Sequence, residues 1–99
     1  MQINKRSNTA VISIDNLSEI FIALGGEGKT RAISRAEKCI SETLGEVCDV
    51  YHIKDNTFVC VSTIDIRGYI SQFKDAVGFS EIKEKYPLKV TVKYENDAL

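Results

Sequence analysis

The sequence contains no tryptophan, one proline, one histidine and three cysteines among its 99 residues. The cysteines, Cys39, Cys48 and Cys60, have no CxxC spacing and are odd in number. This pattern excludes a disulfide framework and a zinc site built on CxxC pairs, and it favours buried thiols in a cytoplasmic protein. The single histidine, His52, has no cysteine or nucleophile at a spacing that indicates a metal site or a catalytic pair.

Long apolar runs and an excess of charge of either sign are also missing. No segment approaches the roughly 20 apolar residues that cross a membrane, and the first residues lack the cleavage pattern of a signal peptide. The formal net charge of −1 argues against a general nucleic-acid-binding surface. Apolar residues make up 43% of the chain and charged residues 27%, which is typical of a globular domain. We therefore expect one cytoplasmic domain over residues 1–99, with flexible ends at 1–8 and 95–99, that binds no membrane, nucleic acid or cofactor.

The hydrophobic pattern predicts strands joined by a split helical crossover, a hairpin and a further helix. Residues 88–95 alternate strictly between apolar and polar, which is typical of an antiparallel strand with one wet face. Asp55 and Asn56 suit the tight turn of a hairpin. The other strands are expected at 8–14, 47–53 and 57–62, and the helices at 17–24, at about 30–44 and from 65 onward. This order predicts an α+β, ferredoxin-like or palm fold of βαββαβ type, with an antiparallel four-stranded sheet and helices on one face.

A glycine-rich octet, ALGGEGKT, separates the first two expected helices. With alanine for its first glycine it fits the phosphate-binding P-loop, in which Gly25, Gly26, Gly28, Lys29 and Thr30 would hold a nucleotide. A P-loop lies between a parallel strand and a helix, whereas the helix here is followed by an antiparallel hairpin. The glycines also suit a plain break between two helices. We therefore interpret the octet as a helix–turn–helix junction and keep a nucleotide-binding protein or NTPase as the alternative function.

Two stretches of the chain, AVISIDNLSEIFIALGGEGKTRAI and VCDVYHIKDNTFVCV, together resemble the GGDEF domain of the diguanylate cyclase family. Asp15 and Asn16 match part of the family's opening motif, and Gly25 matches the glycine of its second motif. Phe58 matches the last residue of the GGDEF signature. The likeness covers residues 9–63 and extends to the last strand, and the family domain is longer than this chain.

The catalytic motif of that family is altered in this sequence. Cyclase chemistry requires two metal-binding carboxylates and a turn that admits a triphosphate. Ser13 stands at the first metal position, and Lys54 and Asp55 replace the two glycines of the turn. Asn56 and Thr57 stand where the signature has acidic residues. The positions of the family's base contacts fall on Phe21 and Thr30, and those of its inhibitory product site fall on Gly45 and Cys48.

The resemblance therefore implies a degenerate, catalytically silent domain with no catalytic or metal-binding residues. Asp15 is retained, and we expect it to serve as a helix N-cap. The chain would then be a non-enzymatic interaction, dimerisation or regulatory domain, within a signalling protein or on its own. A protein partner or a second copy would bind at the open sheet face, the hairpin tip or the last strand. The candidate interaction residues are Lys54, Asp55, Asn56, Val90, Val92 and Tyr94.

Overall fold

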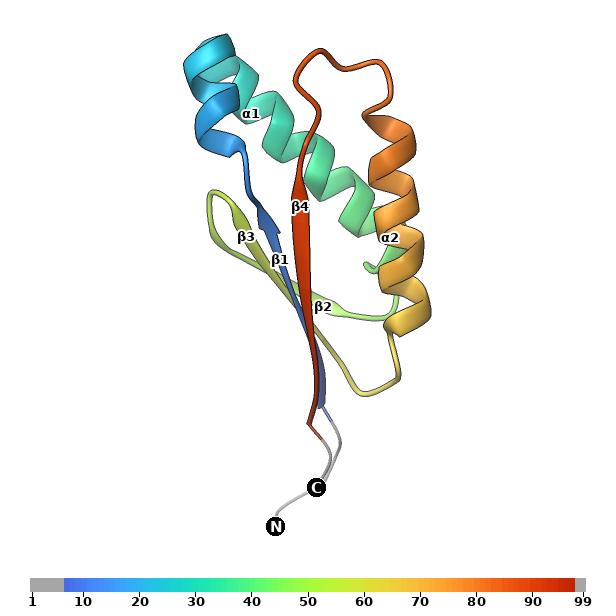
Figure 1. The fold of residues 1–99 in the computed structure, drawn as a ribbon. Helices are drawn as coiled ribbons and strands as arrows, with labels where there is room; N and C mark the ends of the chain where they lie inside the picture. The colour runs from blue at the N-terminus through green and yellow to red at the C-terminus, as the bar shows by residue number, and fades with distance from the viewer. Residues whose placement is uncertain (1–6, 98–99) are drawn as a thin grey trace.

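The computed structural model describes residues 7–97 and has two layers, an antiparallel sheet and two helices that cover one of its faces (Figure 1). The four strands lie in the order β2-β3-β1-β4, so β2 and β4 are the edges of the sheet. This arrangement confirms the predicted α+β fold with its βαββαβ order. The elements are β1 (Ser7–Ile14), α1 (Leu17–Thr43), β2 (Asp49–Lys54), β3 (Thr57–Ser62), α2 (Arg67–Ser80) and β4 (Val90–Asp97).

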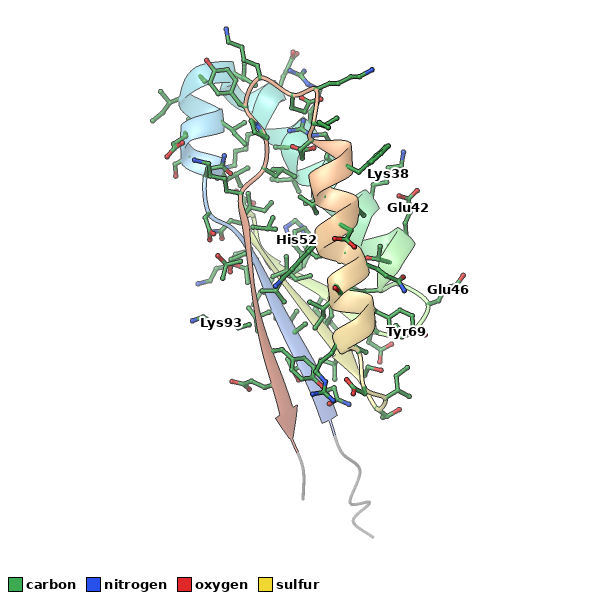
Figure 2. All side chains as sticks on the ribbon, turned by 45° about the vertical axis from the view of Figure 1, so that its right-hand side comes forward. Lys38, Glu42, Glu46, His52, Tyr69 and Lys93 are labelled. Carbon is green, nitrogen blue, oxygen red and sulfur yellow. The ribbon has the colours of Figure 1, made fainter. Side chains whose placement is uncertain are left out.

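Alternation along the strands places the core between the sheet and the helices. On β1, Ala10, Ile12 and Ile14 are at most 1% exposed, because every second side chain turns toward α1 and α2. Phe58 and Cys60 continue this buried surface on β3. The opposite side chains of each strand face away from the helices, and Figure 2 shows Lys93 of β4 projecting outward in this way.

The first crossover is bent at one glycine. Gly25 has φ 73° and ψ −167° inside α1, a conformation that side chains with a Cβ rarely adopt. Gly28 serves close packing, since a Cβ there would lie 2.2 Å from the Cβ of Leu24. The predicted break between two helices is therefore confirmed, although the second helical segment begins directly after Gly25 and not near Thr30.

The ends of the sheet extend farther than the sequence predicts. β1 begins at Ser7 and β4 continues to Asp97, and the two strands pair along this length in the register Asn8↔Asn96. Residues 7–8 and 95–97, for which flexible ends are expected from the sequence, thus lie in a long antiparallel ladder. The rest of that expectation, at 1–6 and 98–99, lies outside the described residues. Within residues 7–97, neither helix is both long enough and apolar enough to cross a membrane.

Candidate functional site

A groove of about 330 Å³ lies at the end of the sheet where β1 passes into α1 and the β2–β3 hairpin turns. Its walls include Asp15, Phe21 and Lys29 from the β1–α1 region, and Asp55 and Asn56 from the hairpin tip. The octet and the altered signature, which lie far apart in the sequence, therefore contribute to one site. The bend at Gly25 makes this possible, because it folds the first helical segment away from the rest of α1.

An ion pair joins the two sides of this groove. The Lys29 ammonium lies 2.8 Å from the Asp55 carboxylate and 5.6 Å from the centroid of the Phe21 ring. Hydrogen bonding and charge attraction from Lys29 lower the pKa of Asp55 below its ordinary value. The lysine of the P-loop-like octet thus contacts protein groups on two sides.

The positions aligned with the family's metal-binding and acidic residues, Ser13, Asn56 and Thr57, also meet at this end of the sheet, but with neutral side chains. Ser13 pairs with Thr57 across β1 and β3. The carbonyl oxygen of Asn56 accepts a hydrogen bond of 2.8 Å from the backbone N–H of Ile14. The Thr57 hydroxyl donates to the side-chain oxygen of Asn56 over 3.0 Å. Phe58 is buried in the core and Lys54 is exposed at the hairpin tip.

The remaining interaction candidates, Val90, Val92 and Tyr94, lie on the last strand. Val90, Val92 and Tyr94 are half-buried against the core on the helical side of the sheet. The Tyr94 hydroxyl also donates a hydrogen bond of 2.8 Å to the side-chain oxygen of Asn8. These side chains therefore lie on the helical side of β4 and not on the open face of the sheet. The backbone edge of β4 remains unpaired within the described residues, and the side chains that alternate with Val90, Val92 and Tyr94 are exposed.

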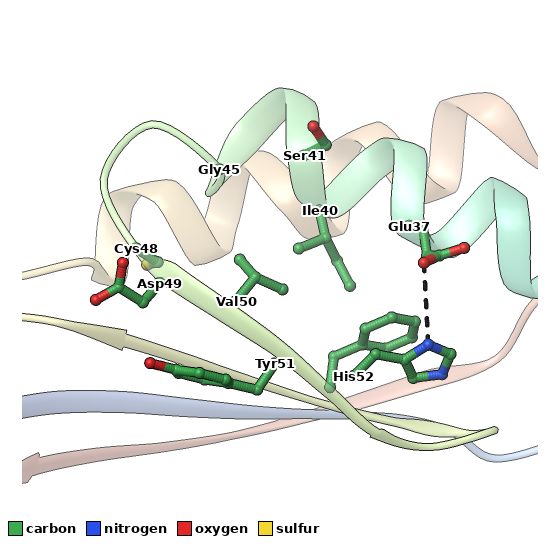
Figure 3. Close-up of a pocket in the computed structure, with 10 residues that line it drawn as sticks. Glu37, Ile40, Ser41, Gly45, Cys48, Asp49, Val50, Tyr51 and His52 are labelled. Carbon is green, nitrogen blue, oxygen red and sulfur yellow. Dashed lines mark ion pairs between the residues drawn. The ribbon is translucent and has the colours of Figure 1, made fainter.

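A second groove, of about 520 Å³, lies between α1 and β2 (Figure 3). His52 stacks on Phe58 with ring centroids 4.2 Å apart, and its Nδ1 lies 3.9 Å from a carboxylate oxygen of Glu37. Gly45 and Cys48, the positions aligned with the family's inhibitory site, also line this groove. No motif indicated the other residues of this groove, because they come from separate elements without a characteristic spacing. Among residues 7–97, no three His, Cys, Asp or Glu side chains are grouped so as to hold a metal ion.

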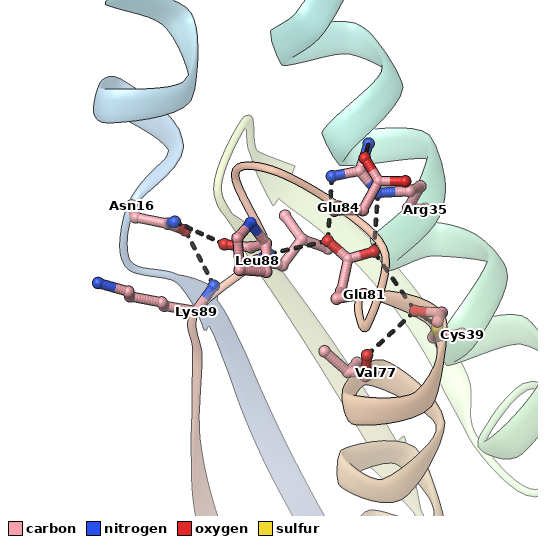
Figure 4. Close-up of polar contacts among 10 residues, drawn as sticks. Asn16, Arg35, Cys39, Val77, Glu81, Glu84, Leu88 and Lys89 are labelled. Carbon is pink, nitrogen blue, oxygen red and sulfur yellow. Dashed lines mark hydrogen bonds and ion pairs between the residues drawn. The ribbon is translucent and has the colours of Figure 1, made fainter. Parts of the chain in front are cut away.

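The start of α1 is not capped as expected. The Asp15 carboxylate accepts a hydrogen bond from the Thr91 hydroxyl of β4, so its predicted role as a helix N-cap is wrong. Asn16 occupies the cap position, but its side chain makes no capping bond. Its amide instead donates to the carbonyl of Pro87 over 2.8 Å and accepts from the N–H of Lys89 over 2.9 Å (Figure 4). Both side chains therefore hold the beginning of β4 against the end of β1.

A buried carboxylate holds the segment between α2 and β4 (Figure 4). The Glu81 side chain is 4% exposed and accepts hydrogen bonds of 2.8 and 3.0 Å from the Arg35 guanidinium. It also accepts 2.8 Å from the N–H of Leu88. The hydrogen bond to Glu81 raises the pKa of Arg35, against the opposing effect of burial. No pattern in the sequence indicated this pair, because Glu81 lies in a run of charged residues typical of a surface.

No protein-family model matches the chain, and no curated protein is similar to it in sequence. Solved structures are similar in fold. The diguanylate cyclase SiaD of Pseudomonas aeruginosa, solved with its activator SiaC, matches with a TM-score of 0.80 and 10% identity over 93% of this chain and 38% of that chain. An EAL/GGDEF domain protein from M. capsulatus matches with a TM-score of 0.79 and 14% identity over 96% of this chain and 66% of that chain. The GGDEF domain of DgcB from Caulobacter crescentus, in complex with c-di-GMP, matches with a TM-score of 0.76 and 9% identity over 93% and 60%.

The comparisons agree with the resemblance that was based on residues 9–63. The match includes nearly the whole of this chain, whereas the chain spans between 38 and 66% of the solved chains. At identities of 9 to 14%, the likeness concerns the path of the backbone and not the chemistry of the side chains. The chain therefore has the fold of GGDEF diguanylate cyclase domains.

Proposed function

We propose that this chain is a GGDEF-fold domain without cyclase chemistry, which acts by binding protein. The observation that carries the proposal is the ion pair of 2.8 Å between Lys29 and Asp55 in the groove at the hairpin tip. By the resemblance, this tip is where a cyclase has a glycine turn that admits a triphosphate. Here a charged side chain from the turn and one from the helix neutralise each other.

Two other polar side chains of the groove, those of Asp15 and Asn56, are also engaged within the protein. The Asp15 carboxylate accepts a hydrogen bond from Thr91, and the Asn56 side chain accepts one from Thr57. Magnesium in nucleotide sites is bound through carboxylates together with substrate phosphates. Asp15 is exposed and is the one acidic residue retained from the opening motif, and the aligned signature positions, Asn56 and Thr57, carry no charge. These side chains therefore support a hairpin tip that is stabilised by contacts within the protein, and they do not favour the binding of a metal–nucleotide complex.

A protein partner fits both the fold and the exposed surface. SiaD, which has the same fold, was solved in complex with an activator protein. In this chain, large apolar side chains are exposed away from the core, among them Ile22 at 83% and Phe79 at 80%. Exposed apolar residues of this size are typical of surfaces that bind other proteins when they gather into patches.

Cyclase activity is the first test. The chain is incubated with GTP and Mg²⁺ or Mn²⁺, beside an active cyclase and a sample without protein, and the products are separated by chromatography. We expect no cyclic dinucleotide above the sample without protein. Clear turnover would refute the proposal.

Nucleotide binding is the second test, and it addresses the alternative function. Calorimetry with GTP and ATP, with and without Mg²⁺, compares the natural chain with Lys29→Ala and with Lys38→Ala. Lys38 is an exposed lysine on the same helix and lies outside the groove, so it provides a matched control. We expect no binding by any of the three. Micromolar binding that is lost only in Lys29→Ala would favour a nucleotide-binding protein that uses the octet.

A further inference from the structure

β4 presents a long backbone edge that no strand within residues 7–97 covers. It has eight residues and pairs with β1 on one side, whereas the opposite side ends the sheet. The other edge, β2, has six residues and an irregular register between His52 and Lys54. Such irregularities blunt an edge against further pairing. β4 therefore provides the better template for an additional strand.

The side chains of β4 differ on its two faces. Val90, Val92 and Tyr94 form a half-buried apolar row on the helical side. Thr91, Lys93 and Glu95 are exposed on the opposite side. Lys89 continues this second row, because its backbone carbonyl accepts a hydrogen bond of 2.7 Å from the backbone N–H of Asp15. This bond extends the ladder between β1 and β4 by one residue. A strand added at this edge would meet an apolar row on one face and both signs of charge on the other.

We propose that β4 pairs with β4 of a second copy, antiparallel and about a two-fold axis at Val92, to form a continuous eight-stranded sheet. The proposal rests on the proposed function, since it specifies the protein partner as a second copy of this chain. In this register Lys89 lies opposite the partner's Glu95, and Glu95 lies opposite the partner's Lys89. Val90 lies opposite the partner's Tyr94, so the apolar rows of the two copies join. Opposite charges and apolar pairs facing across strands stabilise a sheet.

The neighbouring registers are less favourable. A two-fold axis perpendicular to the sheet pairs residues whose side chains lie on the same face of the sheet. The alternative registers therefore differ in which residue of β4 lies on the axis. An axis at Lys93 sets two lysines directly opposite each other, and an axis at Thr91 sets Lys89 opposite the partner's Lys93. An axis at Tyr94 places the apolar Val92 opposite Asn96. An axis at Tyr94 also pairs Lys93 with the partner's Glu95, so the charges disfavour only the axes at Lys93 and Thr91. The apolar row then favours the axis at Val92 over that at Tyr94, because only at Val92 do Val90 and Tyr94 face each other.

A charge exchange tests both the interface and its register. Sedimentation equilibrium at several protein concentrations compares the natural chain with Lys89→Glu, Glu95→Lys and the double variant. Each single variant creates two like-charge pairs in the dimer, and we expect its dissociation constant to rise about tenfold. The double variant reverses both partners of each pair, so we expect it to dimerise about as well as the natural chain. Circular dichroism confirms that each variant is folded, which we expect because both side chains are exposed.

Two controls make the outcome decisive. Lys38→Glu introduces the same charge change on an exposed position of α1, away from β4, and should leave the dissociation constant unchanged. Lys93→Ala should not tighten the dimer, whereas tightening would indicate an axis at Lys93 or Thr91 and overturn the register. A natural chain that stays monomeric at high concentration, or a double variant as weak as the single ones, would overturn the interface. Either result would leave the proposed function standing, because that fails separately, on GTP turnover or nucleotide binding.

Discussion

Replacing Arg35 with methionine should destabilise the domain far more than an ordinary change of a helix surface residue. The guanidinium makes bonds of 2.8 and 3.0 Å to Glu81, whose side chain is 4% exposed. Arg35→Met keeps much of the apolar stem but removes the charge, so the Glu81 carboxylate stays buried without its cation. The same carboxylate holds the N–H of Leu88, which precedes β4.

The size of the effect follows from how completely the pair is enclosed. Removing one partner of a buried ion pair typically destabilises a protein by about 3–5 kcal/mol. Two features reduce this figure, since Arg35 is 24% exposed and the N–H of Leu88 remains as a donor. We therefore expect the free energy of unfolding to fall by about 2–3 kcal/mol. Domains of this size have a total stability of roughly 5–15 kcal/mol, so the loss is easily measured.

Urea denaturation followed by far-ultraviolet circular dichroism provides the measurement, because the chain contains no tryptophan. Arg31→Met is the matched control: Arg31 lies on the same helix, is 63% exposed and is 3.9 Å from Glu27. Its loss should change stability by less than about 0.5 kcal/mol. Glu81→Gln and the double variant complete a cycle, in which we expect clear coupling between positions 35 and 81. An Arg35→Met variant as stable as Arg31→Met would refute the reasoning.

Three further predictions concern the bend, the thiols and an exposed carboxylate. Gly25→Ala should lower stability by about 1–3 kcal/mol because of its backbone conformation, whereas Gly26→Ala, in open space on the helix, should not; equal melting temperatures would contradict this. Burial raises the pKa of Cys60 to about 12, so the protein is not destabilised by this thiol below about pH 9 and loses stability as pH rises toward 12. Iodoacetamide should label the half-buried Cys48 of the native protein first, and early labelling of Cys60 would contradict its burial. Hydrogen bonds from Arg67 lower the pKa of Asp65 to about 2, so the contribution of Asp65 to the free energy of unfolding is present above about pH 4 and is lost below it. Asp65→Asn should flatten the acid side of a plot of stability against pH, and an unchanged plot would contradict this.

The strands and their order could be predicted because their signals are local. Strict alternation marked the last strand, and two β-branched runs separated by Asp55 and Asn56 marked the hairpin. A break between two helices followed from the glycines alone, although its position at Gly25 did not. The extension of β1 to Ser7 and of β4 to residues 96–97 could not be placed, because these polar residues become strand only by pairing across the two strands.

Contacts between distant segments were the part that the sequence could not supply. Asp15 and Asn16 have the residue types of helix caps, yet the bonds that they make reach residues 71 to 76 positions away. Glu81 and Arg35 are 46 positions apart. Alternation showed that Val92 belongs to an apolar row, but only the placement of the helices decides that this row faces the core. Local patterns therefore give the elements, while the partners of polar side chains depend on the assembled fold.

The octet at residues 23–30 shows how the fold changes the meaning of a motif. In sequence, Lys29 is the lysine of a P-loop-like pattern, and Asp55 is a turn residue that has replaced a glycine of the signature. The bend at Gly25 and the hairpin bring the two side chains within 2.8 Å of each other. A lysine that holds a phosphate must offer its charge to the ligand, whereas this ammonium already meets a carboxylate and an aromatic ring. The ion pair with Asp55 thus explains the position of Lys29 without a bound nucleotide. Asp55→Gly separates the two explanations, because it removes the carboxylate and frees the Lys29 ammonium. We expect calorimetry to detect no GTP binding by this variant, and a gain of binding would show that the ion pair conceals a phosphate site.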